Sequence, residues 1–280
     1  MFYIYIFFIS LFSSIVSANP WFSGKDKGSY ALSYIKSDYD RIYRIDKQIH
    51  LNTSINESVT NESFLLETDF GLNSRDTFIF TTIYSNIGSF TNGAPRDLFG
   101  PAYSGISESY FGLRRNYRNR EIAMSMELGL YLSGDYKADA ITAPSFGSDA
   151  LALTWHWGLL LSPDSQFTTS IQYRYYMDNS VSDKYFINSS YVKEFKKDWL
   201  YNIFGMFTNS MGGVNLGDVN SGWTKWSFHK LDEMRLQFGL GLTHNLNEDW
   251  AISCNMSHLF DGRNTDASDQ TLSITISKVF

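Results

Sequence analysis

Hydrophobic and polar side chains alternate along most of this chain, in runs of about ten to fourteen residues. In the run over 147–161, one set of alternate positions carries Leu and Trp, and the other set carries Ala, Thr and His. Successive side chains of a β-strand point to opposite faces. Each run therefore predicts a strand with one apolar face and one more polar face.

Counted back from the last residue, the predicted strands cover 269–280, 249–260, 232–244, 199–210, 185–195, 166–177, 147–161, 120–133, 106–117, 76–88 and 59–71. One more strand must precede 59–71 if both ends of the chain are to lie on the same side of the membrane. The segment Tyr30–Lys47 can supply it. Tyr30 and Tyr43 fall on opposite faces of that segment. A bulge or an extra hairpin therefore remains open there.

The connections between these strands are alternately short and long. The short ones lie near 73–75, 118–119, 162–165, 196–197 and 245–248, and the long ones near 89–105, 134–146, 178–184, 211–231 and 261–268. Short turns at one rim and long loops at the other are typical of transmembrane barrels, which have an even number of strands. The predicted fold is all-β, a transmembrane antiparallel up-and-down β-barrel of about 12 strands.

The last strand alternates strictly from Leu272 and ends on the aromatic residue Phe280. It resembles the closing strand of bacterial outer-membrane β-barrels, although Lys278 departs from that pattern. The resemblance implies that the barrel-assembly machinery recognises this strand. A terminal amphipathic strand of a soluble β protein is the alternative interpretation.

The first residues form an apolar run that ends with Val16-Ser17-Ala18, and the first charged residue is Lys25. This pattern predicts a secretory signal peptide over residues 1–18, followed by the barrel over 19–280. The start carries no Lys or Arg, which departs from that pattern. A retained membrane anchor is the alternative, because the uncharged stretch is long enough to span a membrane. With cleavage, the mature chain is expected in the outer membrane of a Gram-negative bacterium.

Composition narrows the possible functions further. The chain is 43% hydrophobic and 17% aromatic, and its formal net charge is −6. An acidic chain of this kind lacks the excess of basic residues that nucleic-acid binding requires. The single cysteine, Cys254, lies on an apolar face and excludes an internal disulfide. We also expect no metal site and no cofactor.

If the apolar faces contact lipid, the polar faces line the interior of the barrel. The charged residues predicted to line the pore are Glu67, Asp69, Arg114, Glu127, Arg174 and Arg235. Charges of both signs in one interior indicate a narrow wet passage or an interior held together by ion pairs. Both interpretations stay open on the sequence alone.

Three stretches carry a family resemblance: Ser109–Arg114, Glu127–Tyr136 and Pro144–Ser148. With the strands around them, they resemble the outer-membrane transporter family of phenol-degradation pathways (MetA-type). The resemblance covers about a quarter of the chain, from Gly105 to Tyr176. It implies passive uptake of small molecules, and no binding residue carries over.

Barrel enzymes that modify lipids are a rival class. Several pair a His with a Ser two positions later, so that the imidazole takes the hydroxyl proton. None of the 5 histidines here has that neighbour. The predicted function is an outer-membrane passive channel for a small-molecule solute, surrounded by lipid and lipopolysaccharide. A lipid hydrolase and a structural or adhesive surface barrel remain as alternatives.

Overall fold

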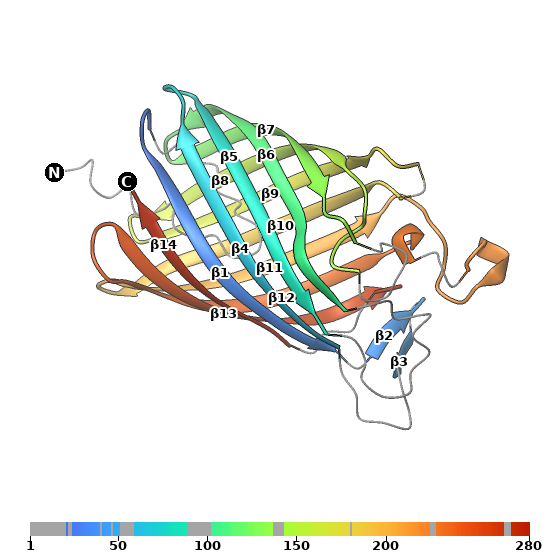
Figure 1. Ribbon diagram of the computed structural model, residues 1–280. Coiled ribbons are helices and arrows are strands. Elements are labelled where there is room, and N and C mark those ends of the chain that lie inside the picture. Colours follow the sequence, from blue (N-terminus) through green and yellow to red (C-terminus); the bar gives the residue numbers. More distant parts are fainter. Residues whose placement is uncertain are drawn as a thin grey trace.

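The computed structural model of the chain describes residues 21, 24–39, 41–45, 47–50, 59–88, 102–136, 143–179, 181–224, 228–265 and 270–280. In this part of the chain, strands pair with their neighbours in antiparallel register around one closed barrel (Figure 1). The order around the wall is β1-β14-β13-β12-β11-β10-β9-β8-β7-β6-β5-β4. β1 thus closes the wall by pairing with both β14 and β4.

The strands of the barrel follow the alternating runs of the sequence. Their bounds are β1 (Gly28–Tyr39), β4 (Val59–Gly71), β5 (Asp76–Ile87), β6 (Tyr103–Asn119), β7 (Ile122–Ser133), β8 (Ala150–Ser162), β9 (Ser165–Tyr176), β10 (Lys184–Lys196), β11 (Trp199–Ser210), β12 (Met234–Asn245), β13 (Trp250–Arg263) and β14 (Gln270–Val279). The predicted 12-strand antiparallel barrel is confirmed. The predicted signal peptide, residues 1–18, lies outside the described residues and stays a prediction.

A single strand over Tyr30–Lys47 is not observed, and the extra hairpin that the sequence left open there is present. β1 ends at Tyr39, and a separate hairpin follows, formed by β2 (Arg41–Arg44) and β3 (Lys47–His50). Ile45 between them has φ 58°, the left-handed conformation that reverses the chain. Tyr43 packs against Leu259 of β13. The hairpin lies beyond the end of the barrel in Figure 1, so the barrel keeps its even strand number.

The connections divide the barrel into two ends. At one end, which we call the turn end, short turns join the strands, and Phe280 lies there in Figure 1. At the opposite loop end lie the longer connections, including two short 3₁₀ helices, η2 (Val219–Ser221) and η3 (Phe228–Lys230). This arrangement agrees with the alternation of short and long connections in the sequence.

The outer surface of the barrel is apolar. Large hydrophobic side chains that point outward are about half exposed, as in Leu128 (61%), Leu240 (57%) and Ile274 (56%). A water-soluble protein rarely leaves a continuous apolar band open. In a bilayer the same band contacts hydrocarbon, and closure of the sheet leaves no unpaired edge. In the described part of the chain, no helix has the length and apolar character needed to cross a membrane.

The inner surface carries hydroxyl groups that bond across neighbouring strands. The Oγ of Ser33 lies 2.7 Å from Oγ1 of Thr275, and Oγ1 of Thr243 lies 2.8 Å from Oγ of Ser253. Such cross-strand pairs stabilise a sheet. They also satisfy polar groups that face away from bulk water.

A β-bulge interrupts the pairing of β5 with β6. Ile83 pairs with Glu108 while Tyr84 pairs with Ile106, so Ser107 is an extra residue in β6. The Ser107 hydroxyl reaches inward to Ser85, at 2.9 Å, and Glu108 also lines the interior. The bulge therefore places two consecutive side chains on the inner face.

The outward band predicts how charge affects stability. Leu128 lies at the middle of β7, so Leu128→Arg should lower the free energy of unfolding in liposomes by about 2–4 kcal/mol. Val219→Arg, on an exposed loop-end 3₁₀ helix, should change it by no more than about 0.5 kcal/mol. Urea unfolding followed by tryptophan fluorescence compares the two variants. Equal destabilisation would show that Leu128 does not face lipid.

Candidate functional site

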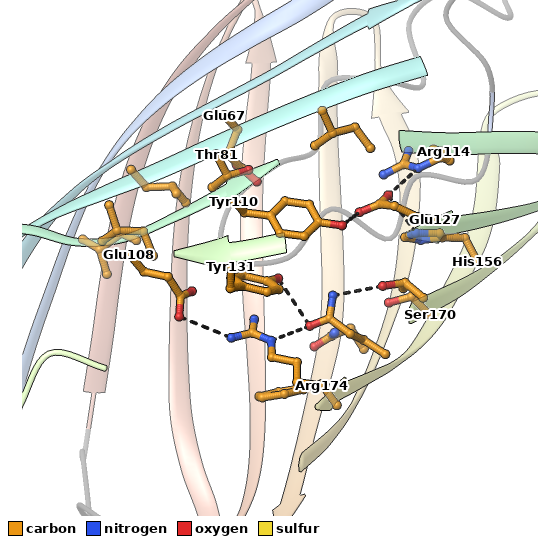
Figure 2. A pocket seen from close by; sticks show the side chains of 18 residues that line it. Glu67, Thr81, Glu108, Tyr110, Arg114, Glu127, Tyr131, His156, Ser170 and Arg174 are labelled. Carbon is orange, nitrogen blue, oxygen red and sulfur yellow. Dashed lines mark hydrogen bonds and ion pairs between the residues drawn. The ribbon is translucent and has the colours of Figure 1, made fainter. Parts of the chain in front are cut away.

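A cavity of about 180 Å³ lies inside the barrel and is the candidate functional site (Figure 2). β1, β4 and β5 contribute mainly aliphatic side chains to its lining, whereas β6–β10 contribute mainly polar and charged ones. The aliphatic side chains are Ile35, Leu65, Ile79 and Ile83. The cavity therefore has one apolar wall and one polar wall.

Glu127, from β7, is the centre of a buried cluster on the polar wall. Its Oε2 accepts a hydrogen bond from Nε of Arg114 at 2.8 Å and lies 3.2 Å from Nε2 of His156. Its other oxygen accepts a hydrogen bond from the hydroxyl of Tyr110 (Figure 2). Glu127 is 4% exposed, and neighbouring strands supply all three partners. Several hydrogen bonds and an opposite charge are what a buried carboxylate needs.

Arg174, from β9, is the centre of a second cluster. Its guanidinium lies 3.6 Å from the ring centre of Tyr131 and 4.4 Å from that of Phe186, as cation–π contacts require. Its Nε donates to Oε1 of Gln172 at 2.7 Å, and one terminal nitrogen lies 3.5 Å from Oε2 of Glu108. The inward bulge of β6 thus supplies the carboxylate that pairs with this guanidinium.

Two tyrosines whose rings are in contact connect the clusters. The rings of Tyr110 and Tyr131 lie 4.4 Å apart between centroids, and the first bonds to Glu127 while the second contacts Arg174. Tyr110 lies directly over Gly129, where an added Cβ would come within 2.2 Å of the ring. Gly129 is therefore required for this close approach. Together, the two clusters form one rigid polar wall.

A third charged cluster lies toward the loop end. Nζ of Lys184 lies 2.6 Å from Oε2 of Glu233, and the hydroxyl of Thr265 donates to Oε1 of Glu233 at 2.9 Å. Arg235 is more distant, at 3.9 Å from Oε1. Burial alone would raise the pKa of the Glu233 carboxyl, but the charges of Lys184 and Arg235 outweigh it and hold the pKa below its ordinary value.

The structure brings together four of the six residues predicted to line a pore: Glu67, Arg114, Glu127 and Arg174 all line the cavity. Asp69 instead accepts hydrogen bonds from the backbone N–H of Ser29 at 2.7 Å and from its hydroxyl at 2.9 Å. Arg235 belongs to the loop-end cluster.

Sequence reasoning missed the pair of Lys184 and Glu233, because its two residues stand 49 positions apart. The sequence pattern places Lys184 in a long connection and does not distinguish Glu233 from other residues of its strand. Among the described residues, no group of three His, Cys, Asp or Glu side chains is placed to hold a metal ion. Cys254 is exposed on the outer face, as its place in the alternation predicts.

Comparison with known proteins finds solved structures that are similar to this chain. No family model matches the chain, and neither does any curated protein. Among solved structures, the chain is similar to the COG4313 outer membrane channel from Pseudomonas putida F1, with a TM-score of 0.75 and 12% identity over 95% of this chain and 100% of that one. The NanC porin gives a TM-score of 0.51 and 8% identity over 88% of this chain and 98% of that one. The chain therefore shares the closed β-barrel fold of these two outer-membrane proteins.

The Glu127 cluster predicts a coupled effect on stability. Glu127→Gln should lower the free energy of unfolding by about 3–5 kcal/mol, because it removes the charge that Glu127 presents to the buried guanidinium of Arg114. The double variant Glu127→Gln/Arg114→Gln should recover a large part of that loss. Urea titration of all three variants in liposomes gives the interaction energy. Simply additive losses would show that the two charges do not act as a pair.

The Glu233 cluster predicts a pH dependence at the loop end. Since the folded pKa is lowered, the carboxylate contributes stability above its unfolded pKa of about 4.3 and loses it as pH falls through the lower folded value. Limited proteolysis of the connection between β11 and β12 should therefore accelerate in acid. In the Glu233→Gln variant, the same connection should be cleaved at a rate that depends much less on pH. An unchanged pH profile in this variant would contradict the assignment.

Proposed function

We propose that this protein is a passive channel for small solutes in the outer membrane of a Gram-negative bacterium. The observation that carries the proposal is a closed barrel with an apolar outer face around a cavity with a polar wall. The similarity of the fold to solved outer-membrane channels supports it. The turn end would face the periplasm and the loop end the outside.

Charge pairing along the wall indicates which solutes and ions such a channel would admit. Arg114 is paired with Glu127, and Arg174 with Glu108, so the cavity has little excess charge of either sign from these groups. A buried ion pair fixes side chains and leaves a weak field at a distance. A channel of this kind would admit small neutral solutes and select weakly between ions. Glu67 is also on this lining, whereas Asp69 and Arg235 would act from outside the cavity.

The rival enzymatic function has less support. His156 is 3% exposed on the inner face, where bilayer lipid does not reach it. Ser125 and Ser170 stand beside it on the neighbouring strands, but neither hydroxyl is hydrogen-bonded to its ring. A nucleophile and its base are normally within hydrogen-bond reach. The proposal therefore includes no catalytic residue and no cofactor.

The remaining partners follow from the same proposal. Lipid and lipopolysaccharide would contact the outer face, and the barrel-assembly machinery would recognise β14 with the terminal Phe280. Tyr30 and Trp250 contact each other on the outer face near the turn end, with ring centroids 6.0 Å apart, as interfacial aromatic residues do. The signal peptide would be removed after Ala18.

The test is single-channel conductance in a planar bilayer, with heat-modifiable gel migration as the check of folding. Wild type should give discrete conductance steps with weak ion selectivity. Arg174→Gln should shift the reversal potential toward cation preference, because Glu108 loses its counter-charge, and Glu108→Gln should shift it the opposite way. The double variant should return close to wild type.

Two outcomes would count against the proposal. A folded barrel without conductance would reject the channel. Conductance with a reversal potential unmoved by Arg174→Gln and Glu108→Gln would reject the role of this ion pair in permeation.

A further inference from the structure

Four inward-facing side chains form a row across four neighbouring strands of the polar wall. The pairing register places Ser125 of β7 opposite His156 of β8, His156 opposite Ser170 of β9, and Ser170 opposite Asn188 of β10. Neighbouring strands lie about 4.8 Å apart, so the row extends over about 14 Å. Each of the four residues is buried, with exposed fractions of 2%, 3%, 0% and 6% in that order.

Each member of this row carries a polar atom without a hydrogen-bond partner among the described residues. These atoms are Oγ of Ser125, Nδ1 of His156, Oγ of Ser170 and Nδ2 of Asn188. Buried polar groups in proteins are normally satisfied, and hydroxyls elsewhere on this inner face do bond across strands. His156, Ser170 and Asn188 line the cavity. These three residues therefore offer unused hydrogen-bonding capacity to a molecule in the cavity.

The chemistry of the row follows from the Glu127 cluster. Glu127 already accepts hydrogen bonds from Arg114 and Tyr110, and a carboxylate only accepts, so the Nε2 of His156 beside it carries the hydrogen. In the neutral ring, Nδ1 is then an acceptor. The two serine hydroxyls both donate and accept, and the amide nitrogen of Asn188 donates. The row thus presents no formal charge, but both kinds of hydrogen-bonding group.

The rest of the cavity limits the occupant further. The charged groups of the polar wall are already paired with one another and call for no charged ligand, and Glu67 of β4 is the remaining charged group of the lining. Leu65, Ile79 and Ile83 supply an apolar wall that suits C–H groups. A volume of about 180 Å³ admits only a small molecule.

We propose that His156, Ser170 and Asn188, the three members of the row that line the cavity, form a binding subsite for a small uncharged solute that carries several hydroxyl groups, such as a linear polyol or a monosaccharide. The subsite rests on the proposed channel function and specifies its substrate class. The hydroxyls of the solute bond to the row, and its C–H groups face the aliphatic wall.

The test is block of the ion current by xylitol in the planar bilayer. Xylitol should reduce the wild-type current in a saturable way, because bound solute obstructs ions. Triethylene glycol dimethyl ether, which is uncharged and has no hydroxyl, should produce no saturable block. Ser170→Ala removes only a hydroxyl without a partner, and should raise the half-blocking xylitol concentration about fivefold. Ser170→Ala/Asn188→Leu should raise it by more than about tenfold.

Ser253→Ala is the matched control, because this inner-face hydroxyl bonds to Thr243 and lies outside the row. It should leave the half-blocking concentration unchanged. Equal block by xylitol and by the ether, or block in the double variant equal to wild type, would overturn the subsite while leaving the channel standing.

Equilibrium dialysis with radiolabelled xylitol tests the subsite on the folded, detergent-solubilised barrel, independently of conductance. Binding that the double variant loses would support the subsite even if no current were observed, and would then reject only the channel. Conductance without any xylitol binding would reject only the subsite.

Discussion

Closure of the backbone hydrogen-bond network is the constraint on which the rest of this structure depends. In hydrocarbon, an unpaired N–H or C=O group is so costly that a sheet can cross only if its first and last strands pair. Here β1 provides that closure, since it pairs with β14 over Ser29–Asp38 and with β4 over Gly28–Tyr39. Once the ring is closed, the alternation of side chains leaves each strand with one face for lipid and one for the interior. The polar wall, the aliphatic wall and the paired charges are arranged on that inner face.

The inner charges illustrate how a narrow interior stays polar without becoming unstable. Glu127 is held by a guanidinium, an imidazole and a phenol, and Arg174 by a carboxylate, an amide and two aromatic rings. Each ion is therefore solvated by side chains rather than by bulk water. These partners come from neighbouring strands, so the polar wall and the barrel wall stabilise each other. The row from Ser125 to Asn188 differs from these clusters, because its polar atoms without a partner belong to neutral groups.

Most of the fold could be predicted from the sequence, because side-chain alternation is a local property. The predicted limits 59–71 and 199–210 agree with β4 and β11 residue for residue. The first strand could not be predicted in the same way. Tyr43 is buried by a contact with Leu259, and the hairpin that carries it depends on a positive φ at Ile45. The local pattern shows that the alternation breaks in this segment, but it does not distinguish a bulge from a hairpin.

The candidate site was predictable only in part, for a related reason. Alternation assigns Glu127 and Arg174 to the inner face, but it does not say which charges meet. The pair of Lys184 and Glu233, and the position of Glu108 beside Arg174, depend on register and on a bulge. The face on which a side chain lies follows from the local alternation. The pairing register depends on the neighbouring strands of the closed barrel.

The bulge at Ser107 also has a consequence for how this chain can change in length. In a regular strand, one inserted residue inverts every side chain on one side of it, and would turn Ile106 from lipid to the interior. Here the extra residue is absorbed where it stands: Ile106 remains 55% exposed on the outer face, and Glu108 remains inside. Loss of Ser107 would restore regular pairing and preserve both assignments. β6 can therefore lose a single residue at this point while its side chains keep their inward and outward directions.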